Sequence, residues 1–140
     1  MTQIMLVDDD VNYLKSLVRI FRGKSDYKVV AFNNAADALA EARQNDYDVI
    51  ISDLRMPIVD GVTFLSQIKK KQPMAARIIL SGFCDKEALY AAINVAHADR
   101  YLEKPCSPET LSKVVSEVLT ERKLKHSAYT NHVEDRGGDG

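Results

Sequence analysis

Short apolar runs that alternate with segments of helical periodicity constrain the fold of this chain more than any other feature. The runs are rich in Val, Ile and Leu and have the length of buried strands, whereas the segments between them are long enough for helices. The expected strands are Ile4–Val7, Lys28–Phe32, Asp48–Ser52, Arg77–Ser81 and Arg100–Glu103. Strict alternation of strands with helices predicts an α/β fold with a doubly wound, five-stranded parallel sheet.

The segments between the strands carry apolar residues at the spacing of one helix face. The stripes are Leu14, Leu17, Val18 and Phe21; Ala35, Ala38, Leu39 and Ala42; Leu65 and Ile68; Leu89, Ala92, Ile93 and Ala96; and Leu111, Val114, Val115 and Val118. The last helix has a clear start, because Ser107 is a favourable N-cap and Pro108 can begin a helix without losing a hydrogen bond. Asp10 and Asp85 are the N-caps expected for the first and fourth helices.

The composition fits a single domain. The chain has 140 residues, of which 46% are hydrophobic and 28% charged, with a formal net charge of −1. This balance gives no basic surface for nucleic acid, and no apolar run approaches the roughly 20 residues of a membrane helix. We expect a cytoplasmic protein, because the N-terminus lacks the pattern of a signal peptide. Residues 1–126 form the expected domain, and the polar residues 127–140 are expected to be a flexible tail.

Polar side chains stand where the expected strands end. They are Asp8, Asp9 and Asp10 after the first strand, Asp53 after the third, Ser81 at the end of the fourth and Lys104 after the fifth. Because ligands bind at the carboxyl ends of the strands in such sheets, these groups should converge on one crevice. Two carboxylates about 4 Å apart repel by roughly 4 kcal/mol at an effective dielectric of about 20, so a cluster of them needs a cation. Carboxylate oxygens suit Mg²⁺, and a carboxylate can attack phosphorus to form an acyl phosphate.

The strand-end residues belong to longer motifs. These are Leu6-Val7-Asp8-Asp9-Asp10, Ser52-Asp53-Leu54-Arg55-Met56-Pro57 with Asp60-Gly61, Ile79-Leu80-Ser81-Gly82, and Tyr101-Leu102-Glu103-Lys104-Pro105. In this order and spacing they resemble the response-regulator receiver domain of two-component signalling, the CheY-like family. The resemblance covers about residues 2–124 and implies a flavodoxin-like sheet with the strand order 2-1-3-4-5.

The resemblance also implies roles for the acidic residues. Asp53 would be the phospho-acceptor. Asp8, Asp9 and Asp53, with the backbone carbonyl of Arg55, would hold a Mg²⁺ or Mn²⁺ ion. Three adjacent acids permit a shift of this assignment by one position, although Asp10 fits better as the cap of the first helix.

Further roles follow for the remaining motif residues. Lys104 would contact the phosphoryl group, and Ser81 would be the switch hydroxyl that moves towards it. Tyr101 would be the aromatic residue that changes between outward and inward positions. The bond between Lys104 and Pro105 would be cis, an isomer nearly confined to bonds that precede proline.

The resemblance implies partners as well. A histidine kinase or a phosphotransfer protein would supply the phosphoryl group, and a downstream protein or a fused output domain would read the switched surface of the fourth helix, fifth strand and fifth helix. The domain itself would contact neither nucleic acid nor a membrane, and would be a self-phosphorylating and self-dephosphorylating switch rather than a turnover enzyme. A homodimer that forms on phosphorylation is compatible with this interpretation, as is a longer regulator of which this chain is one part.

Two other functions remain as alternatives. Asp8-x-Asp10-Val11 after an apolar strand also resembles the first motif of haloacid-dehalogenase-type phosphatases, in which Asp8 would be the nucleophile and Asp10 the acid and base. That family has a further acidic motif after its lysine, which this sequence lacks, and the motif around Asp53 would have no purpose. The other alternative is a receiver-like interaction module that does not use the phosphoryl chemistry.

Overall fold

The computed structural model describes the backbone of residues 1–24, 26–56, 60–82 and 86–138, and the side chains of these residues except 86 and 125–138. Within these ranges the strands form one parallel sheet in the order β2-β1-β3-β4-β5. The strands are β1 (Thr2–Val7), β2 (Tyr27–Phe32), β3 (Val49–Ser52), β4 (Ala76–Ser81) and β5 (Arg100–Glu103). The helices are α1 (Val11–Arg22), α2 (Ala35–Gln44), α3 (Gly61–Lys71), α4 (Lys86–Asn94) and α5 (Pro108–Gly138). The flavodoxin-like fold and its strand order are therefore confirmed.

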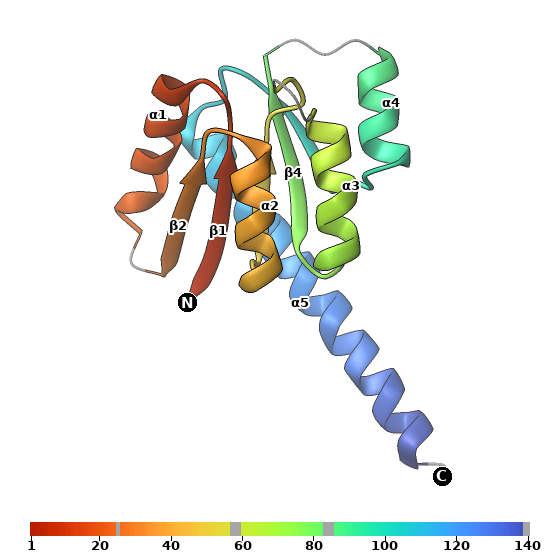
Figure 1. The fold of residues 1–140 in the computed structure, drawn as a ribbon. Coiled ribbons are helices and arrows are strands. Elements are labelled where there is room, and N and C mark those ends of the chain that lie inside the picture. Colours follow the sequence, from red (N-terminus) through yellow and green to blue (C-terminus); the bar gives the residue numbers. More distant parts are fainter. Residues whose placement is uncertain (25, 57–59, 83–85, 139–140) are drawn as a thin grey trace.

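Two hydrophobic cores hold the helices against the two faces of the sheet. Figure 1 shows α2 and α3 in front of the sheet and α5 behind it. Alternate residues of a strand point to opposite faces, so Ile4 and Leu6 of β1 join the core beneath α1 and α5, while Met5 and Val7 join the core beneath α2 and α3. The central strands are thus buried on both sides, which explains their continuous apolar sequences.

Two helices begin at the expected caps. A carboxylate oxygen of Asp10 accepts hydrogen bonds from the backbone N–H groups of Asn12 and Tyr13, both at 3.1 Å. The hydroxyl of Ser107 accepts one from the N–H of Thr110 at 3.1 Å. These bonds satisfy amides that have no partner within their own helix. The expected cap at position 85 lies outside the described residues.

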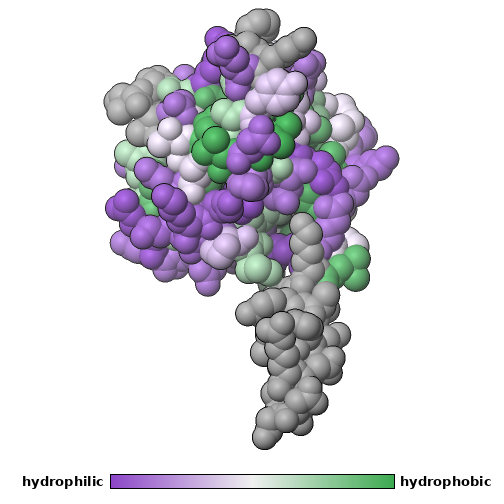
Figure 2. Space-filling view, turned by 90° about the vertical axis from the view of Figure 1, so that its right-hand side faces the viewer, coloured by the Kyte–Doolittle hydropathy of each residue, from purple (hydrophilic) through white to green (hydrophobic). Residues whose placement is uncertain are grey.

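Helix α4 buries a narrower face than its sequence predicts. Ala92 is fully buried, as is Ala96 just beyond the end of the helix, whereas Ile93, which the apolar spacing also assigns to the core, is 48% exposed. The helix contacts α3, and alanines bring it close to its neighbour, so the residue next to Ala92 points outward. Tyr90 and Val95 are exposed as well. The side that carries α4 therefore has apolar surface among hydrophilic side chains (Figure 2).

Helix α5 is longer than the sequence predicts. It ends at Gly138, so the backbone of residues 127–138 is helical where a flexible tail is expected. A helix that has already formed adds each residue with one further hydrogen bond, so a polar segment can continue it. Figure 1 shows this part of α5 projecting away from the sheet, and the domain limit at residue 126 stays a prediction. Within the described ranges, neither α5 nor any other helix combines the length and apolarity of a membrane span.

Ionic contacts attach α5 to the amino ends of the strands. The guanidinium of Arg122 lies 2.9 Å from the carboxylate of Asp48, just before β3, and donates a hydrogen bond to the carbonyl of Met74 at 2.6 Å. Arg100 at the start of β5 pairs with Glu121. These contacts lie at the end of the sheet opposite the strand-end acids.

Candidate functional site: an acidic pocket around a lysine

The strand ends that carry the polar residues lie next to one another. The strand pairings are Val7 with Ser52, Ser52 with Ile79, and Ser81 with Glu103. Backbone hydrogen bonds continue this ladder past the strands, from the N–H of Asp53 to Val7 at 3.0 Å and from the N–H of Lys104 to Ser81 at 2.9 Å. The residues that directly follow β1, β3 and β5 therefore reach the same edge of the sheet.

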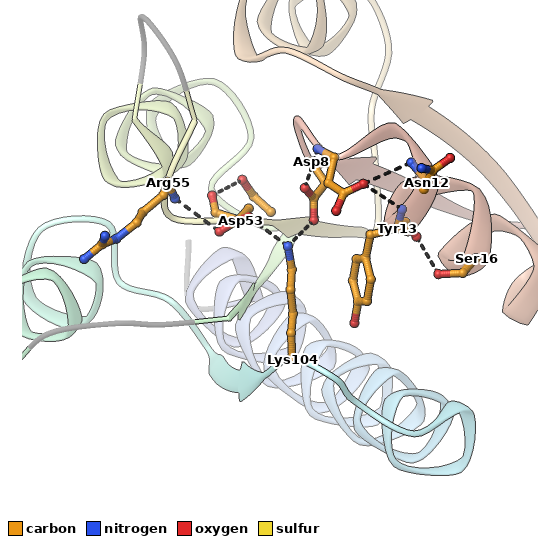
Figure 3. A network of polar contacts seen from close by, with 9 residues as sticks. Asp8, Asn12, Tyr13, Ser16, Asp53, Arg55 and Lys104 are labelled. Atoms are coloured by element: carbon orange, nitrogen blue, oxygen red, sulfur yellow. Dashed lines mark hydrogen bonds and ion pairs between the residues drawn. The ribbon is translucent and has the colours of Figure 1, made fainter.

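The ammonium of Lys104 lies between two carboxylates. Its Nζ is 2.6 Å from Oδ2 of Asp8 and 2.8 Å from Oδ2 of Asp53, and Figure 3 shows the lysine side chain reaching between them. The second oxygen of each carboxylate accepts a backbone hydrogen bond, from the N–H of Asp10 to Asp8 at 2.9 Å and from the N–H of Arg55 to Asp53 at 3.1 Å. The side chains of Asp8, Asp53 and Lys104 are only 2%, 9% and 17% exposed, so these contacts are largely shielded from solvent.

Asp8, Asp9 and Asp53 form one acidic cluster. Each offers a carboxylate oxygen, and the three oxygens lie within 4.8 Å of one another. Asp8 and Asp53 are buried, whereas Asp9 is exposed. Asp10 does not join them, because its carboxylate caps α1. The structure therefore brings Asp8, Asp9 and Asp53 together and leaves Asp10 out.

Burial and charge act in opposite directions on the groups of this pocket. Burial raises the pKa of Asp8, aided by the nearby carboxylate of Asp53, although Lys104 and the N–H of Asp10 oppose the change. Burial alone would lower the pKa of Lys104, but its hydrogen bonds to Asp53 and Asp8 outweigh burial, so its pKa is raised. Lys104 thus stays positively charged, but its single charge does not balance the negative charges of the clustered carboxylates.

The oxygen ligands of the cluster fit a hard divalent cation. Mg²⁺ takes an octahedron of oxygens at about 2.0–2.1 Å, so its ligands are separated by about 3–4 Å. The three carboxylate oxygens, all within 4.8 Å of one another, need little movement to reach that arrangement. The exposed Asp9 leaves one side open for the waters that Mg²⁺ usually keeps. The backbone of Arg55 lies beside the cluster, because its N–H donates to Asp53.

The remaining expected site residues lie on β4 and β5, the strands that end beside this pocket. Ser81 ends β4 and is 1% exposed. Tyr101 pairs with Ile79 in the sheet and is half-buried against the core beneath α2, α3 and α4. The Lys104–Pro105 bond is cis, as the family resemblance implies.

Gly61 allows the start of α3 to approach Asp53 closely. A Cβ at this position would lie 2.1 Å from the carbonyl oxygen of Asp53 and 2.6 Å from the Cα of Leu54. Real Cβ atoms do not approach backbone so closely, so any side chain here would push α3 and Asp53 apart. The motif that contains Gly61 is visible in the sequence, but this steric role is not, because it depends on contact with a segment several residues away.

Tyr13 is a further neighbour of the pocket that the sequence reasoning missed. Its ring lies on the first turn of α1, and the Nζ of Lys104 is 4.6 Å from the ring centroid. In the sequence, Tyr13 looks like part of the apolar side of α1. The sequence feature that could have identified Tyr13 as a neighbour of the pocket is its place in the first turn of a helix that begins directly after the acidic motif.

The fold and the site together define a class of protein, a doubly wound α/β domain with an acidic pocket at the carboxyl edge of its sheet. A family model described as the response regulator receiver domain matches residues 4–116. The chain belongs to this family, whose members are signalling domains of two-component systems.

Individual relatives and solved structures agree with this assignment. The chain is 31% identical over 137 residues to the hydrogenase transcriptional regulatory protein HoxA of Bradyrhizobium diazoefficiens, an alignment that covers 98% of the chain and 28% of that relative. It is 31% identical over 127 residues to the transcriptional regulatory protein ZraR of Klebsiella oxytoca, with 91% of the chain and 28% of that relative covered. The chain thus spans little more than a quarter of the length of either regulator.

Among solved structures, a CheY-like response regulator receiver domain protein from Methanospirillum hungatei superposes with a TM-score of 0.86 at 27% identity, covering 89% of this chain and 98% of that one. The signal receiver domain of an HD domain-containing protein from Pseudomonas fluorescens gives a TM-score of 0.84 at 28% identity, covering 88% and 98%. In both cases nearly the whole of the other chain is matched, so the similarity extends over a complete receiver fold.

Replacement of Gly61 tests the close approach of α3 to Asp53. We expect Gly61→Ala to lower the free energy of unfolding by about 1–3 kcal/mol, the usual effect of forcing an atom into a filled space. Gly23→Ala is the matched control, because a Cβ at position 23 would meet no atom within 4 Å. Urea unfolding of both variants measures the difference, and equal stabilities would contradict the steric role.

Replacement of Asp8 tests whether its buried charge opposes folding. Because the folded-state pKa of Asp8 lies above 3.8, the folded protein binds this proton more tightly than the unfolded chain. Stability should therefore fall as pH rises from 3.8 through the folded-state pKa, and the deficit should be complete above it. In metal-free buffer we expect Asp8→Asn to be more stable than the wild type at neutral pH, with a difference that shrinks in acid.

Urea unfolding at several pH values measures this difference. Asp46→Asn serves as the control, because Asp46 is exposed and lies outside the acidic cluster. A less stable Asp8→Asn variant at neutral pH would mean that the ion pair with Lys104 outweighs the burial of the carboxylate.

Proposed function

We propose that this domain is a phospho-acceptor switch, in which Asp53 receives a phosphoryl group from the phosphohistidine of a histidine kinase or a phosphotransfer protein. The observation that carries the proposal is the buried Asp53 carboxylate, held by Lys104 and clustered with Asp8 and Asp9. A carboxylate oxygen of Asp53 attacks phosphorus, the P–N bond to the donor imidazole breaks, and the electron pair returns to the imidazole nitrogen. The product is an aspartyl phosphate on Asp53.

Hydrogen bonds around Asp53 orient it for this reaction. Its Oδ1 is fixed by the N–H of Arg55 and its Oδ2 by Lys104. Lys104, whose raised pKa keeps it protonated, is within reach of a phosphoryl group on Asp53 and can stabilise the charge that develops during transfer. Ser81, at the end of the neighbouring strand β4, is the proposed hydroxyl donor to a phosphoryl oxygen.

Asp8, Asp9, Asp53 and the backbone carbonyl of Arg55 are the proposed ligands of Mg²⁺ or Mn²⁺. Such an ion supplies positive charge that neutralises phosphoryl oxygens in the transition state. The same charge would relieve the mutual repulsion of the acids, which a single ammonium from Lys104 cannot balance. The acids themselves position the ion beside Asp53.

The proposed output is a changed surface rather than a released product. Ser81 moves towards the phosphoryl group and Tyr101 turns inward, which shifts the population of states of the surface formed by α4, β5 and α5. Tyr90 and Ile93 of α4 are exposed and give this surface apolar contacts for a partner. A downstream protein, a fused output domain or a second copy of the domain is the proposed partner, in the cytoplasm.

A phosphatase of the haloacid-dehalogenase type is less well supported by the site. In such an enzyme Asp8 would be a free nucleophile and Asp10 a proton donor. Here Asp8 is paired with Lys104, and the Asp10 carboxylate accepts two hydrogen bonds at the start of α1. Asp53, buried beside Asp8, would be left without a role.

Phosphorylation by a small donor tests the proposal. With acetyl phosphate and Mg²⁺, we expect the intact protein to gain the mass of one phosphoryl group, and Asp53→Asn to gain none. Asp37→Asn, an exposed acid of α2, is the matched control and should behave as the wild type. Turnover of p-nitrophenyl phosphate that requires Asp8 but survives Asp53→Asn would favour the phosphatase, and no mass gain in the wild type would favour an inert interaction module.

Metal binding gives a second, independent test. A ligand that binds only the folded state at one hundred times its Kd raises the free energy of unfolding by about 2.7 kcal/mol. We expect Mg²⁺ to raise the melting temperature of the wild type, and to have much less effect on Asp8→Asn, which lacks one charged ligand. Equal Mg²⁺ stabilisation of the two proteins would show that the ion binds elsewhere.

A further inference from the structure

The aromatic ring of Tyr13 lies beside the Lys104 ammonium. Two of the three donor positions of this group are directed at Asp8 and Asp53. The Tyr13 ring centroid lies 4.6 Å from Nζ, inside the roughly 6 Å range over which a cation is attracted by an aromatic face. Figure 3 shows the ring of Tyr13 alongside the lysine side chain, below Asp8.

The place of Tyr13 is fixed by its own backbone. It lies in the first turn of α1, and its N–H donates to the Asp10 carboxylate at 3.1 Å. The acidic motif that supplies Asp8 and Asp9 therefore also sets the start of the helix that carries the ring. The hydrophobic core beneath α1 and α5 packs against one part of the half-buried side chain.

We propose that Tyr13 is a positioning residue, whose ring holds the Lys104 ammonium between Asp8 and Asp53. A role of Tyr13 in phosphoryl transfer rests on the function proposed above, the phosphorylation of Asp53. When Asp53 becomes an aspartyl phosphate, one of its oxygens is bonded to phosphorus and the carboxylate that Lys104 contacts loses its charge. The Tyr13 ring is unchanged by the reaction. Tyr13 thus provides the contact that keeps Lys104 in the pocket before and after transfer.

The ionisation of the two groups agrees with this geometry. Burial raises the pKa of Tyr13, even though the backbone N–H of Cys106 and the charge of Lys104 favour the ionised phenol. The ring is therefore a neutral π face rather than a phenolate. Such a face attracts an ammonium more strongly where water is excluded, and the Lys104 side chain is only 17% exposed.

Packing alone is the competing explanation, and matched substitutions separate the two. Tyr13→Phe keeps the ring, and Tyr13→Leu keeps apolar volume without a π face. Tyr27→Leu is the control for general packing, because Tyr27 contacts the same core and packs against Phe21 in a tilted arrangement, with 5.9 Å between ring centroids. Urea unfolding identifies any variant that has lost its fold.

The first measurement does not require phosphorylation. A methylene group beside an aromatic face shows an upfield ring-current shift, so the Lys104 Hε resonances should be shifted in the wild type and in Tyr13→Phe. They should return to ordinary lysine values in Tyr13→Leu and stay shifted in Tyr27→Leu. Ordinary values in the wild type, or unchanged shifts in Tyr13→Leu, would overturn the proposal.

The second measurement is the rate of phosphorylation by acetyl phosphate at saturating Mg²⁺. We expect Tyr13→Leu to slow it by about fivefold to tenfold, as loss of a partly shielded cation–π contact predicts, while Tyr13→Phe and Tyr27→Leu stay within about twofold of the wild type. A rate for Tyr13→Leu equal to that of the wild type would overturn the positioning role. If the wild type gains no phosphoryl group at all, the proposed function fails. The chemical shifts of Lys104 would still show whether the Tyr13 ring holds the ammonium in the pocket.

Discussion

The contact of one ammonium with two buried carboxylates is the interaction on which the rest of this site depends. Asp8 and Asp53 end neighbouring strands, and their ionised side chains repel each other in a place where water cannot screen them. Lys104 offsets part of that repulsion through short contacts to both. The pocket still carries more acidic than basic charge, since Asp9 belongs to the same cluster. This excess of negative charge favours the binding of a further cation, which is the basis of the metal site proposed above.

The same residues link the chemistry of the pocket to the formation of the fold. Asp8, Asp53 and Lys104 come from distant parts of the chain and meet only when β1, β3 and β5 are aligned in one sheet. The start of α1 is organised by the adjacent acids, because the Asp10 N–H donates to Asp8 while the Asp10 carboxylate caps the helix. A change at one strand end therefore reaches a helix terminus through a few hydrogen bonds.

The two ends of the sheet carry different kinds of contact. At the amino ends, ion pairs from Arg122 and Arg100 attach α5 to the body of the domain. At the carboxyl ends, polar groups surround the buried Asp53 carboxylate, and on the side of α4 apolar side chains face solvent. The long α5 then leads away from the sheet (Figure 1). Relatives in which the matching segment is about a quarter of a longer transcriptional regulator are consistent with such a division of labour.

The sequence by itself determined the strand and helix order, because apolar periodicity depends only on local spacing. It also determined that acids, a serine and a lysine end the strands, and that Asp10 and Ser107 cap helices. Apolar spacing alone was not sufficient for Ile93, which fits the apolar period of α4 yet is exposed to solvent. The helical backbone after residue 126 has no apolar pattern from which the sequence could have predicted it.

The sequence left the assignment among three adjacent acids open by one position, and the tertiary structure placed Asp8 and Asp9 beside Asp53, since a sequence gives the order of side chains but not their directions. The tertiary structure alone placed the Tyr13 ring against Lys104 and the backbone of Gly61 against Asp53. Both contacts join segments whose separation is fixed by the packing of helices on the sheet. Local sequence rules describe how a chain folds on itself over a few residues, whereas the arrangement of charges in this pocket follows from how distant elements meet.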